Sequence, residues 1–282
     1  MSDPFFSIVT VTLNCRQDAL LTARSLWSQE GASYEYVVKD GMSGDGTPEA
    51  IRRAGKAVVR VQRDSGIFDA MNQALRYCTG RYVLFLNAGD ILVRPDALSV
   101  VGGYAMNRGF PEILYTHYIH LLQRAEIRHP SRPSRFYLFR GTVCHQATYV
   151  RRDCYESFGG FDLSFPVLAD DEMLARLVCG HGLRAELCPI VSVAYKGGGF
   201  SSTPTNVRWE FTGRRRIQER YFSCAERLLF RAVLLVTLHP LRDWLLHSFR
   251  SRLYARAHRW VSNRLVGGPS VPAVNLRRVD GD

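Results

Sequence analysis

Residues Ser7–Val38 read SIVTVTLNCRQDALLTARSLWSQEGASYEYVV, and this stretch decides the fold class. Its first segment, Ser7–Leu13, is rich in β-branched residues, which favour a strand. Apolar residues then recur with helical spacing over Asp18–Gln29. A second predicted strand, Tyr34–Val38, follows this helix. Because parallel strands need a long crossover, a strand, a helix and a strand in this order predict a parallel pair.

The same alternation continues to residue 86 and predicts an α/β fold with a mostly parallel central sheet. After residue 90 the pattern is weaker. A helix, two consecutive strands, a basic aromatic loop and a second helix are expected there. The predicted elements beyond the first three are helix Thr47–Ala54, strand Ala57–Val61, helix Ile67–Tyr77, strand Tyr82–Leu86, helix Pro95–Tyr104, strands Glu112–His117 and Tyr118–Leu122, loop Ser131–Phe139 and helix Asp171–Cys179.

Composition excludes several classes of protein. The chain has 282 residues, 46% of them hydrophobic, which is the balance of a globular protein and not of a disordered one. Its seven cysteines form no CxxC pair, so neither a disulfide framework nor a zinc site is expected. Free thiols of this kind indicate a protein of the reducing cytosol. No apolar run reaches the roughly 18 residues of a membrane span. The N-terminus lacks the basic region of a secretory signal.

The charge is concentrated towards the C-terminus. Formal net charge is +11, and residues 201–282 hold fifteen Arg against six Asp or Glu, a net +9, which leaves +2 for residues 1–200. The apolar run Leu228–Leu238 is followed by apolar residues at mostly four-residue steps, with arginines opposite them. This pattern predicts a basic amphipathic segment over 223–266 lying in a membrane interface, before a flexible tail at 267–282. The alternative is a helix packed on the body with a solvated basic face.

Polar side chains follow the predicted strands, where ligands bind in parallel sheets. One group is VVKDGMSGDGT (Val37–Thr47), and RDSGIFDAMNQAL (Arg63–Leu75) and FLNAGD (Phe85–Asp90) are two others. Glycines there let the backbone approach a ligand. The alternatives are an Asp-Gly turn in the first segment, a capped helix start in the second, which is favoured when that segment is taken by itself, and an Asn-Ala-Gly-Asp turn in the third. The candidate binding residues in and before these segments are Asn14, Asp40, Ser43, Asp64, Gly66, Asn72, Asn87 and Asp90.

Three further segments are candidates for chemistry. ADDEMLAR (Ala169–Arg176) opens a predicted helix with three acids, which serve either as a general base or as N-terminal caps. His145-Gln146 follows an expected strand, and the histidine is either a ligand or a satisfied core group. GGGFSS (Gly197–Ser202) is a loop that closes over phosphates or only a connection.

Taken in order, these segments closely resemble a family-2 glycosyltransferase of the colanic-acid or exopolysaccharide type over residues 6–220. The resemblance implies a GT-A nucleotide-sugar-binding domain at 1–222. It also implies an inverting enzyme that takes a sugar from a nucleotide-sugar, usually UDP-linked, with Mn²⁺ or Mg²⁺ as cofactor.

The matching positions imply roles for individual residues. Asp170 falls on the catalytic-base position, with Asp171 and Glu172 as close competitors. The donor-binding set is Asn14, Asp40, Ser43, Asp64, Gly66, Asn72, Asn87, His145 and Gln146. The NAGD turn stands where the family has an acidic DxD-like motif. Here Asn87 and Gly89 replace two acids, so Asp90 is the remaining metal ligand.

The resemblance further implies a polyprenyl-diphosphate-linked saccharide acceptor and a cytoplasmic enzyme at the inner face of the membrane, held there by residues 225–266. An inactive scaffold of the same fold is the main alternative, because the metal motif is reduced. A nucleic-acid-binding protein fits the charge, but no helix-turn-helix, zinc or RNA-binding signature is present. A dinucleotide-dependent oxidoreductase is disfavoured because no GxGxxG follows the first strand.

Overall fold

A computed structural model describes residues 4–197 and 204–237 of the chain. It divides into two compact units, Met1–Arg227 and Leu228–Asp282. The predicted amphipathic segment beyond residue 237, the tail at 267–282 and all of GGGFSS except Gly197 lie outside the described residues. The predicted domain boundary at residue 222 stays a prediction.

The N-terminal half is the predicted parallel α/β array. Strand β1 pairs in parallel with β2 over seven residues and with β4 over four, and β2 pairs in parallel with β3. Every predicted element of this half is present, with ends displaced by no more than two residues. The elements are β1 (Phe6–Thr12), α1 (Arg16–Trp27), β2 (Tyr34–Asp40), α2 (Thr47–Ala54), β3 (Val58–Val61), α3 (Ile67–Leu75) and β4 (Tyr82–Phe85).

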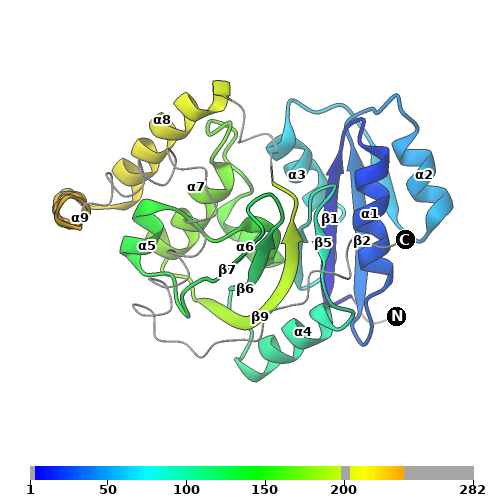
Figure 1. Cartoon of the computed structure of the whole chain (residues 1–282), viewed down its shortest axis with the longest axis horizontal. Coiled ribbons are helices and arrows are strands. Elements are labelled where there is room, and N and C mark those ends of the chain that lie inside the picture. Colours follow the sequence, from blue (N-terminus) through cyan, green and yellow to red (C-terminus); the bar gives the residue numbers. More distant parts are fainter. Residues whose placement is uncertain (1–3, 198–203, 238–282) are drawn as a thin grey trace. The chain divides into compact units, whose positions relative to one another are not determined.

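The strand order places helices on both faces of this half of the sheet. Along the sheet the order is β3-β2-β1-β4, so the chain moves outward from β1 twice and then returns to its other side. Because such crossovers are right-handed, α1 and α2 cover one face and α3 covers the other (Figure 1). The direction reverses beside β1, which makes the carboxyl ends of β1 and β4 the natural ligand crevice.

The second half of the sheet is mixed. Strand β8 (Thr148–Arg151) pairs antiparallel with β4 and with β6 (Ile113–His120), and β6 pairs in parallel with β9 (Ala185–Tyr195). The two longest pairings, β1 with β2 and β6 with β9, are both parallel. The smaller elements are β5 (Ile91–Leu92), α4 (Ala97–Asn107), β7 (Ala125–Ile127), α5 (Arg135–Arg140), the 3-10 turn His145–Ala147 and α6 (Arg152–Phe158).

Three predictions for this half are corrected by the structure. The two strands expected at Glu112–His117 and Tyr118–Leu122 are one strand, β6, whose pairing with β9 shifts register around His117. The expected loop Ser131–Phe139 contains helix α5, capped by Ser134, whose side chain accepts from the Tyr137 amide. His145 precedes strand β8 and does not follow a strand.

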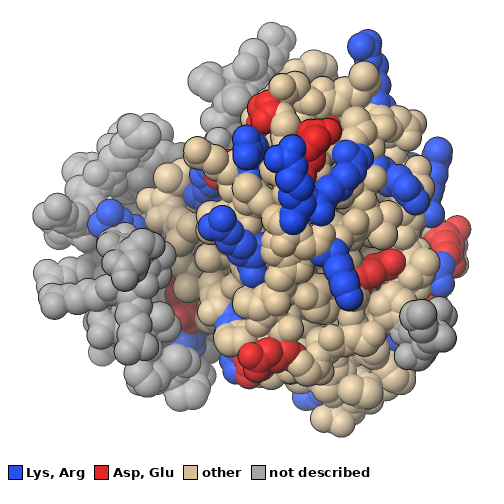
Figure 2. Space-filling model, turned by 90° about the vertical axis from the view of Figure 1, so that its right-hand side faces the viewer, with Lys and Arg blue, Asp and Glu red and all other residues tan. Residues whose placement is uncertain are grey.

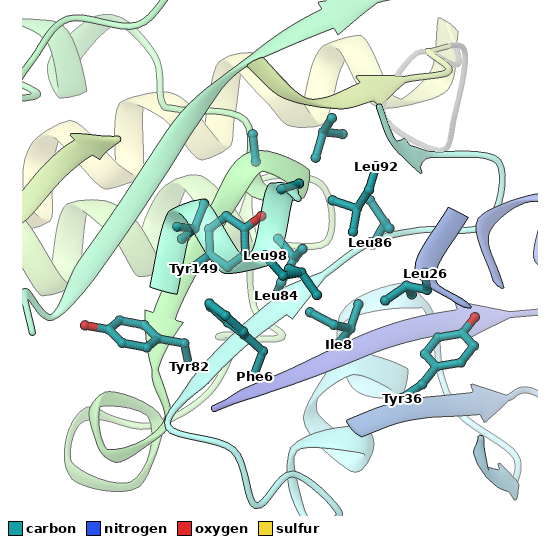
Figure 3. Packing of buried hydrophobic residues seen from close by; sticks show 14 of the residues in the cluster. Phe6, Ile8, Leu26, Tyr36, Tyr82, Leu84, Leu86, Leu92, Leu98 and Tyr149 are labelled. Carbon is teal, nitrogen blue, oxygen red and sulfur yellow. The ribbon is translucent and has the colours of Figure 1, made fainter. Parts of the chain in front are cut away.

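A large cluster of buried apolar residues joins the two halves. Phe6 and Ile8 of β1, Leu84 of β4 and Tyr149 of β8 meet beneath helices α1 and α4 (Figure 3). All four side chains are at most 1% exposed. Burial of this many apolar side chains, each worth about 1.5–3 kcal/mol, fixes the strand ends that carry the polar residues.

The last described helices are α7 (Ala169–Ala175), followed by a π-helical turn at Arg176–Gly180, then α8 (Pro204–Tyr221) and α9 (Cys224–Val236). The predicted helix Asp171–Cys179 covers α7 and most of that turn. Among the described residues, no helix is both long and apolar enough to cross a membrane.

Basic side chains also gather on the N-terminal part of the chain, although residues 1–200 have a net charge of only +2. The face that carries α2 shows far more Lys and Arg than Asp and Glu (Figure 2). Arg52 and Arg53 of α2, and Lys56 and Arg60 after it, are all exposed. The positive charge is therefore not confined to the C-terminal segment.

Candidate active site

The predicted site residues meet at one edge of the parallel sheet. Asn14 follows β1, Asp40 ends β2, Asp64 follows β3 and the Asn87–Asp90 turn follows β4. These are the carboxyl ends of four neighbouring parallel strands. The strand order reverses between β2 and β4 about β1, so this edge is the switch-point crevice of the fold.

Asp40 holds the loop after β2 against the loop after β1. Its carboxylate accepts from Thr12 Oγ1 at 2.7 Å, from the Ser43 amide at 2.7 Å and from Ser43 Oγ at 2.6 Å. Ser43 Oγ accepts from the Asn14 amide at 2.8 Å, and Asn14 Oδ1 accepts from the Gly44 amide at 2.8 Å. These hydrogen bonds join the two loops at this edge of the sheet. A direct contact of Asn14, Asp40 or Ser43 with a donor stays a prediction.

Asp64 is neutralised by a buried lysine that the sequence did not single out. Lys39 Nζ pairs with Asp64 Oδ2 and donates to the Gln62 carbonyl at 2.7 Å, and its side chain is 1% exposed. Asp64 Oδ1 accepts from the Gly66 amide at 3.2 Å, where α3 begins. The only available signal was a lysine within a β-branched strand, in a chain that has 34 Arg and 3 Lys.

Asn72 connects α3 to the loop that leads to the predicted base. Its Nδ2 donates to the Phe161 carbonyl at 2.9 Å, and its Oδ1 accepts from the Phe161 amide at 2.8 Å. Arg176 donates to three carbonyls just before, Phe158, Gly159 and Gly160. Both polar atoms of Asn72 are therefore used within the protein, and its contact with a donor stays a prediction.

The NAGD turn is held from below by Thr22 of α1. Thr22 Oγ1 accepts from the Gly89 amide at 2.9 Å and donates to the Asp90 carbonyl at 2.8 Å. Asp90 Oδ1 accepts from the Lys196 amide at 2.8 Å. Burial raises the pKa of Asp90 to about 6, against hydrogen bonds from Lys196 and Gln146 and the charge of His145.

These residues fit a cation that takes much of its coordination from substrate. Among the described residues no three His, Cys, Asp or Glu side chains form a metal cluster. Mg²⁺ needs only one or two carboxylates when phosphate oxygens and waters complete its shell. Asp90 supplies one carboxylate, and Asn87 Oδ1 is a buried oxygen with no hydrogen-bond partner in this structure. Gly89 has φ +94°, and a Cβ there would lie 2.7 Å from Lys196 Cδ, so any side chain at this position would be strained.

The three acids of α7 have different surroundings. The Asp171 side chain is 5% exposed and pairs with Arg214 of α8. The Glu172 side chain is 0% exposed and contacts Tyr221, Arg176 and Arg220. The Asp170 side chain is 17% exposed and has no Arg or Lys partner within the described part of the chain. Asp170 is thus the most exposed of the three acids and the one without an Arg or Lys partner there.

His145 contacts Asp170 directly. His145 Nδ1 lies 2.7 Å from Asp170 Oδ2, and Asn87 Nδ2 lies 3.1 Å from His145 Nε2. Burial alone would raise the pKa of Asp170, but the hydrogen bond and charge of His145 outweigh it and lower that pKa. Burial likewise opposes protonation of His145, and Asp170 outweighs it, so the pKa of His145 is raised.

A continuous series of side-chain contacts therefore links the NAGD turn to α7: Asn87 contacts His145, and His145 contacts Asp170. The sequence predicted each residue separately but not this order of contacts. It also missed Thr22, a polar residue on the apolar side of a predicted helix, which is fully buried. Arg214 and Tyr221 carried no signal, because helix spacing does not reveal partners 43 or 49 residues away.

Comparisons with known proteins agree with this geometry. Residues 7–161, more than half of the chain, match the sequence model of glycosyl transferase family 2. A PGL/p-HBAD biosynthesis glycosyltransferase of Mycobacterium bovis is 29% identical over 209 residues, covering 72% of this chain and 81% of that protein.

Solved structures give the same fold. TarS 1-349 of S. aureus in complex with UDP-GlcNAc superimposes with a TM-score of 0.63 at 16% identity, covering 82% of this chain and 71% of that one. The mannosyltransferase PcManGT of Pyrobaculum calidifontis, in complex with GDP-Man and Mn²⁺, gives 0.55 at 17% identity, covering 95% and 89%. These are GT-A glycosyltransferases. The expected GT-A fold is confirmed, and the chain belongs to glycosyl transferase family 2.

Proposed function

We propose that this glycosyltransferase moves a sugar, with inversion, from a nucleotide-sugar to a lipid-linked saccharide in bacterial exopolysaccharide or related surface-polysaccharide synthesis. One observation carries the catalytic part: Asp170 alone among the three acids of α7 lacks an Arg or Lys partner in the described chain, while His145 orients one of its oxygens. The donor class is proposed from neighbours whose complexes contain UDP, UDP-GlcNAc or GDP-Man.

In the proposed reaction, Asp170 accepts the proton of the acceptor hydroxyl as that oxygen attacks the anomeric carbon of the donor. The bond from this carbon to the diphosphate oxygen breaks, and the nucleoside diphosphate leaves. One carboxylate base suffices because inversion needs no covalent intermediate. Asp90 would hold Mn²⁺ or Mg²⁺, which supplies positive charge for the leaving diphosphate when bound.

The donor site is tested by calorimetric titration with UDP, GDP and dTDP, each with and without Mn²⁺. We expect one nucleotide to bind in a metal-dependent way. Replacing Asp90 with alanine should weaken this binding by at least about tenfold, because Asp90 is the charged side chain of the NAGD turn. The matched control is Asp96→Ala, an exposed acid paired with Arg94.

Each result has a defined meaning. Equal Mn²⁺ dependence in wild type and Asp90→Ala contradicts the metal assignment. A folded wild-type chain that binds none of the three nucleotides contradicts the donor assignment. Nucleotide binding without release of nucleotide from any donor supports the inactive scaffold.

Membrane association is proposed from the exposed apolar face of α9. Leu228 and Leu235 are 69% and 68% exposed, and they lie on one side of the helix with Leu229 and Val236. Arg231 borders this face. An exposed apolar stripe with basic margins is the pattern of a helix that lies in the lipid headgroup region.

We expect the full chain to sediment with vesicles of phosphatidylglycerol and phosphatidylethanolamine. Each buried leucine contributes about 1.5–3 kcal/mol, so the double variant Leu228→Glu/Leu235→Glu should bind these vesicles at least about tenfold more weakly. Leu21→Glu is the control, since Leu21 is an exposed leucine of α1. Equal sedimentation of the double variant and wild type contradicts the membrane role of α9.

A further inference from the structure

Helix α8 supplies charged and polar partners to the two acids beside Asp170. Arg214 pairs with Asp171, and the Tyr221 hydroxyl donates to Glu172. Figure 1 shows α8 lying along α7, and the two helices are in contact. Helices α7 and α8 both lie beyond residues 7–161, the part of the chain that matches the family model.

The two acids need these partners because both are buried. A buried carboxylate without a partner is strongly destabilising. Glu172 has Arg176 at 3.3 Å and Arg220 at 3.7 Å in addition to Tyr221. For Asp171, Arg214 is the only basic partner in the described part of the chain. One side of the first turn of α7 therefore depends on a single arginine.

The packing of α8 places Arg214 firmly. A Cβ added to Gly213 would lie 3.2 Å from Leu168 Cδ1, so the backbone of α8 passes close to the residue before α7. Ile217, one turn further along α8, is fully buried. Arg214 thus reaches Asp171 from a helix that is packed on both sides of it.

We propose that Arg214 is a positioning residue for the base: by holding Asp171 it fixes the first turn of α7 and turns Asp170 towards His145 and the acceptor. Consecutive residues of an α-helix point about 100° apart, because one turn holds 3.6 residues. When Asp171 is held against α8, Asp170 therefore lies on a different side of α7, where His145 Nδ1 meets its carboxylate at 2.7 Å. This inference rests on the proposed role of Asp170.

The test uses the full chain with Arg214→Leu, and Arg215→Leu as matched control. Arg215 is the next residue of α8, and its side chain is 74% exposed and pairs with Glu219 on the same helix. Turnover is measured as nucleotide released from UDP-GlcNAc, UDP-glucose and GDP-mannose. We expect kcat of Arg214→Leu to fall by about tenfold, since small misplacements of a catalytic group are costly. KM and nucleotide affinity should stay near wild type, because the donor loops lie elsewhere.

A second variant separates positioning from stability. Asp171→Asn/Arg214→Leu removes the buried charge together with its partner, so its melting temperature should return towards wild type. Its kcat should stay low, because the contact that orients α7 is still missing. Recovery of both melting temperature and kcat would mean that Arg214 serves stability alone, and would overturn the inference.

Other outcomes are equally decisive. An active wild type with kcat unchanged in Arg214→Leu overturns this inference and leaves the proposed function standing. A wild-type chain that neither binds nor releases any nucleotide overturns the proposed function and this inference with it. Equal losses in Arg214→Leu and Arg215→Leu also overturn it, because the effect would then not depend on Asp171.

Discussion

Replacing Asp170 with asparagine should lower kcat by about 10²- to 10⁴-fold, the usual contribution of a general base. Asparagine keeps the size of the side chain and still accepts the hydrogen bond from His145, but it cannot take a proton. The low pKa of Asp170 keeps the carboxylate ionised at neutral pH, ready for that proton. Nucleotide affinity, measured by calorimetry, should change little, since the loops after β1 and β2 are unaffected.

The neighbouring acids provide the controls for this prediction. Asp171→Asn should lower kcat less, because the Asp171 side chain is only 5% exposed and is paired with Arg214. Burial raises the pKa of Asp171 to about 6, although Arg214 opposes the rise. A larger loss of kcat in Asp171→Asn than in Asp170→Asn would transfer the base to Asp171.

The parallel half of the fold was predictable because its signals are local. Each strand is an apolar or β-branched run, each helix has its own spacing, and short turns separate them. Strand β9 was missed because Pro189 lies within it, and proline lacks the amide that a ladder needs. The structure accommodates it where the pairing of β6 with β9 shifts register, between Tyr115↔Leu187 and His117↔Val191.

The candidate site was predictable as a set of residues but not as a set of contacts. Strand ends and acids at a helix start mark Asp40, Asp90 and Asp170 in the sequence. Their partners come from distant segments: Lys196 contacts Asp90 across 106 residues, and His145 contacts Asp170 across 25. Nothing in the local pattern records such pairs, since they depend on how strands are ordered in the sheet.

The short helix α5, six residues long, was missed because it holds too few turns to show periodicity.

Replacing His145 with alanine should lower kcat by about 100-fold at neutral pH, because the base then loses the group that orients it. The dependence on pH should change as well. His145 lowers the pKa of Asp170 against the effect of burial, so its removal should raise that pKa. Since the base works only when deprotonated, the acid limb of the kcat–pH profile should move to higher pH. The loss relative to wild type should therefore be larger at pH 6 than at pH 8.

Two variants test whether this effect comes from the contact with Asp170. His145→Gln keeps a hydrogen-bond donor near Asp170, so it should recover part of kcat and part of the pH shift. His181→Ala is the matched control, because His181 is exposed and packs on Phe158, with 4.3 Å between the two ring centroids, away from Asp170. If His145→Ala lowered kcat equally at all pH values, His145 would not set the pKa of the base. A role confined to the packing around Asn87 would then explain the loss, and the contact between His145 and Asp170 would have no part in proton transfer.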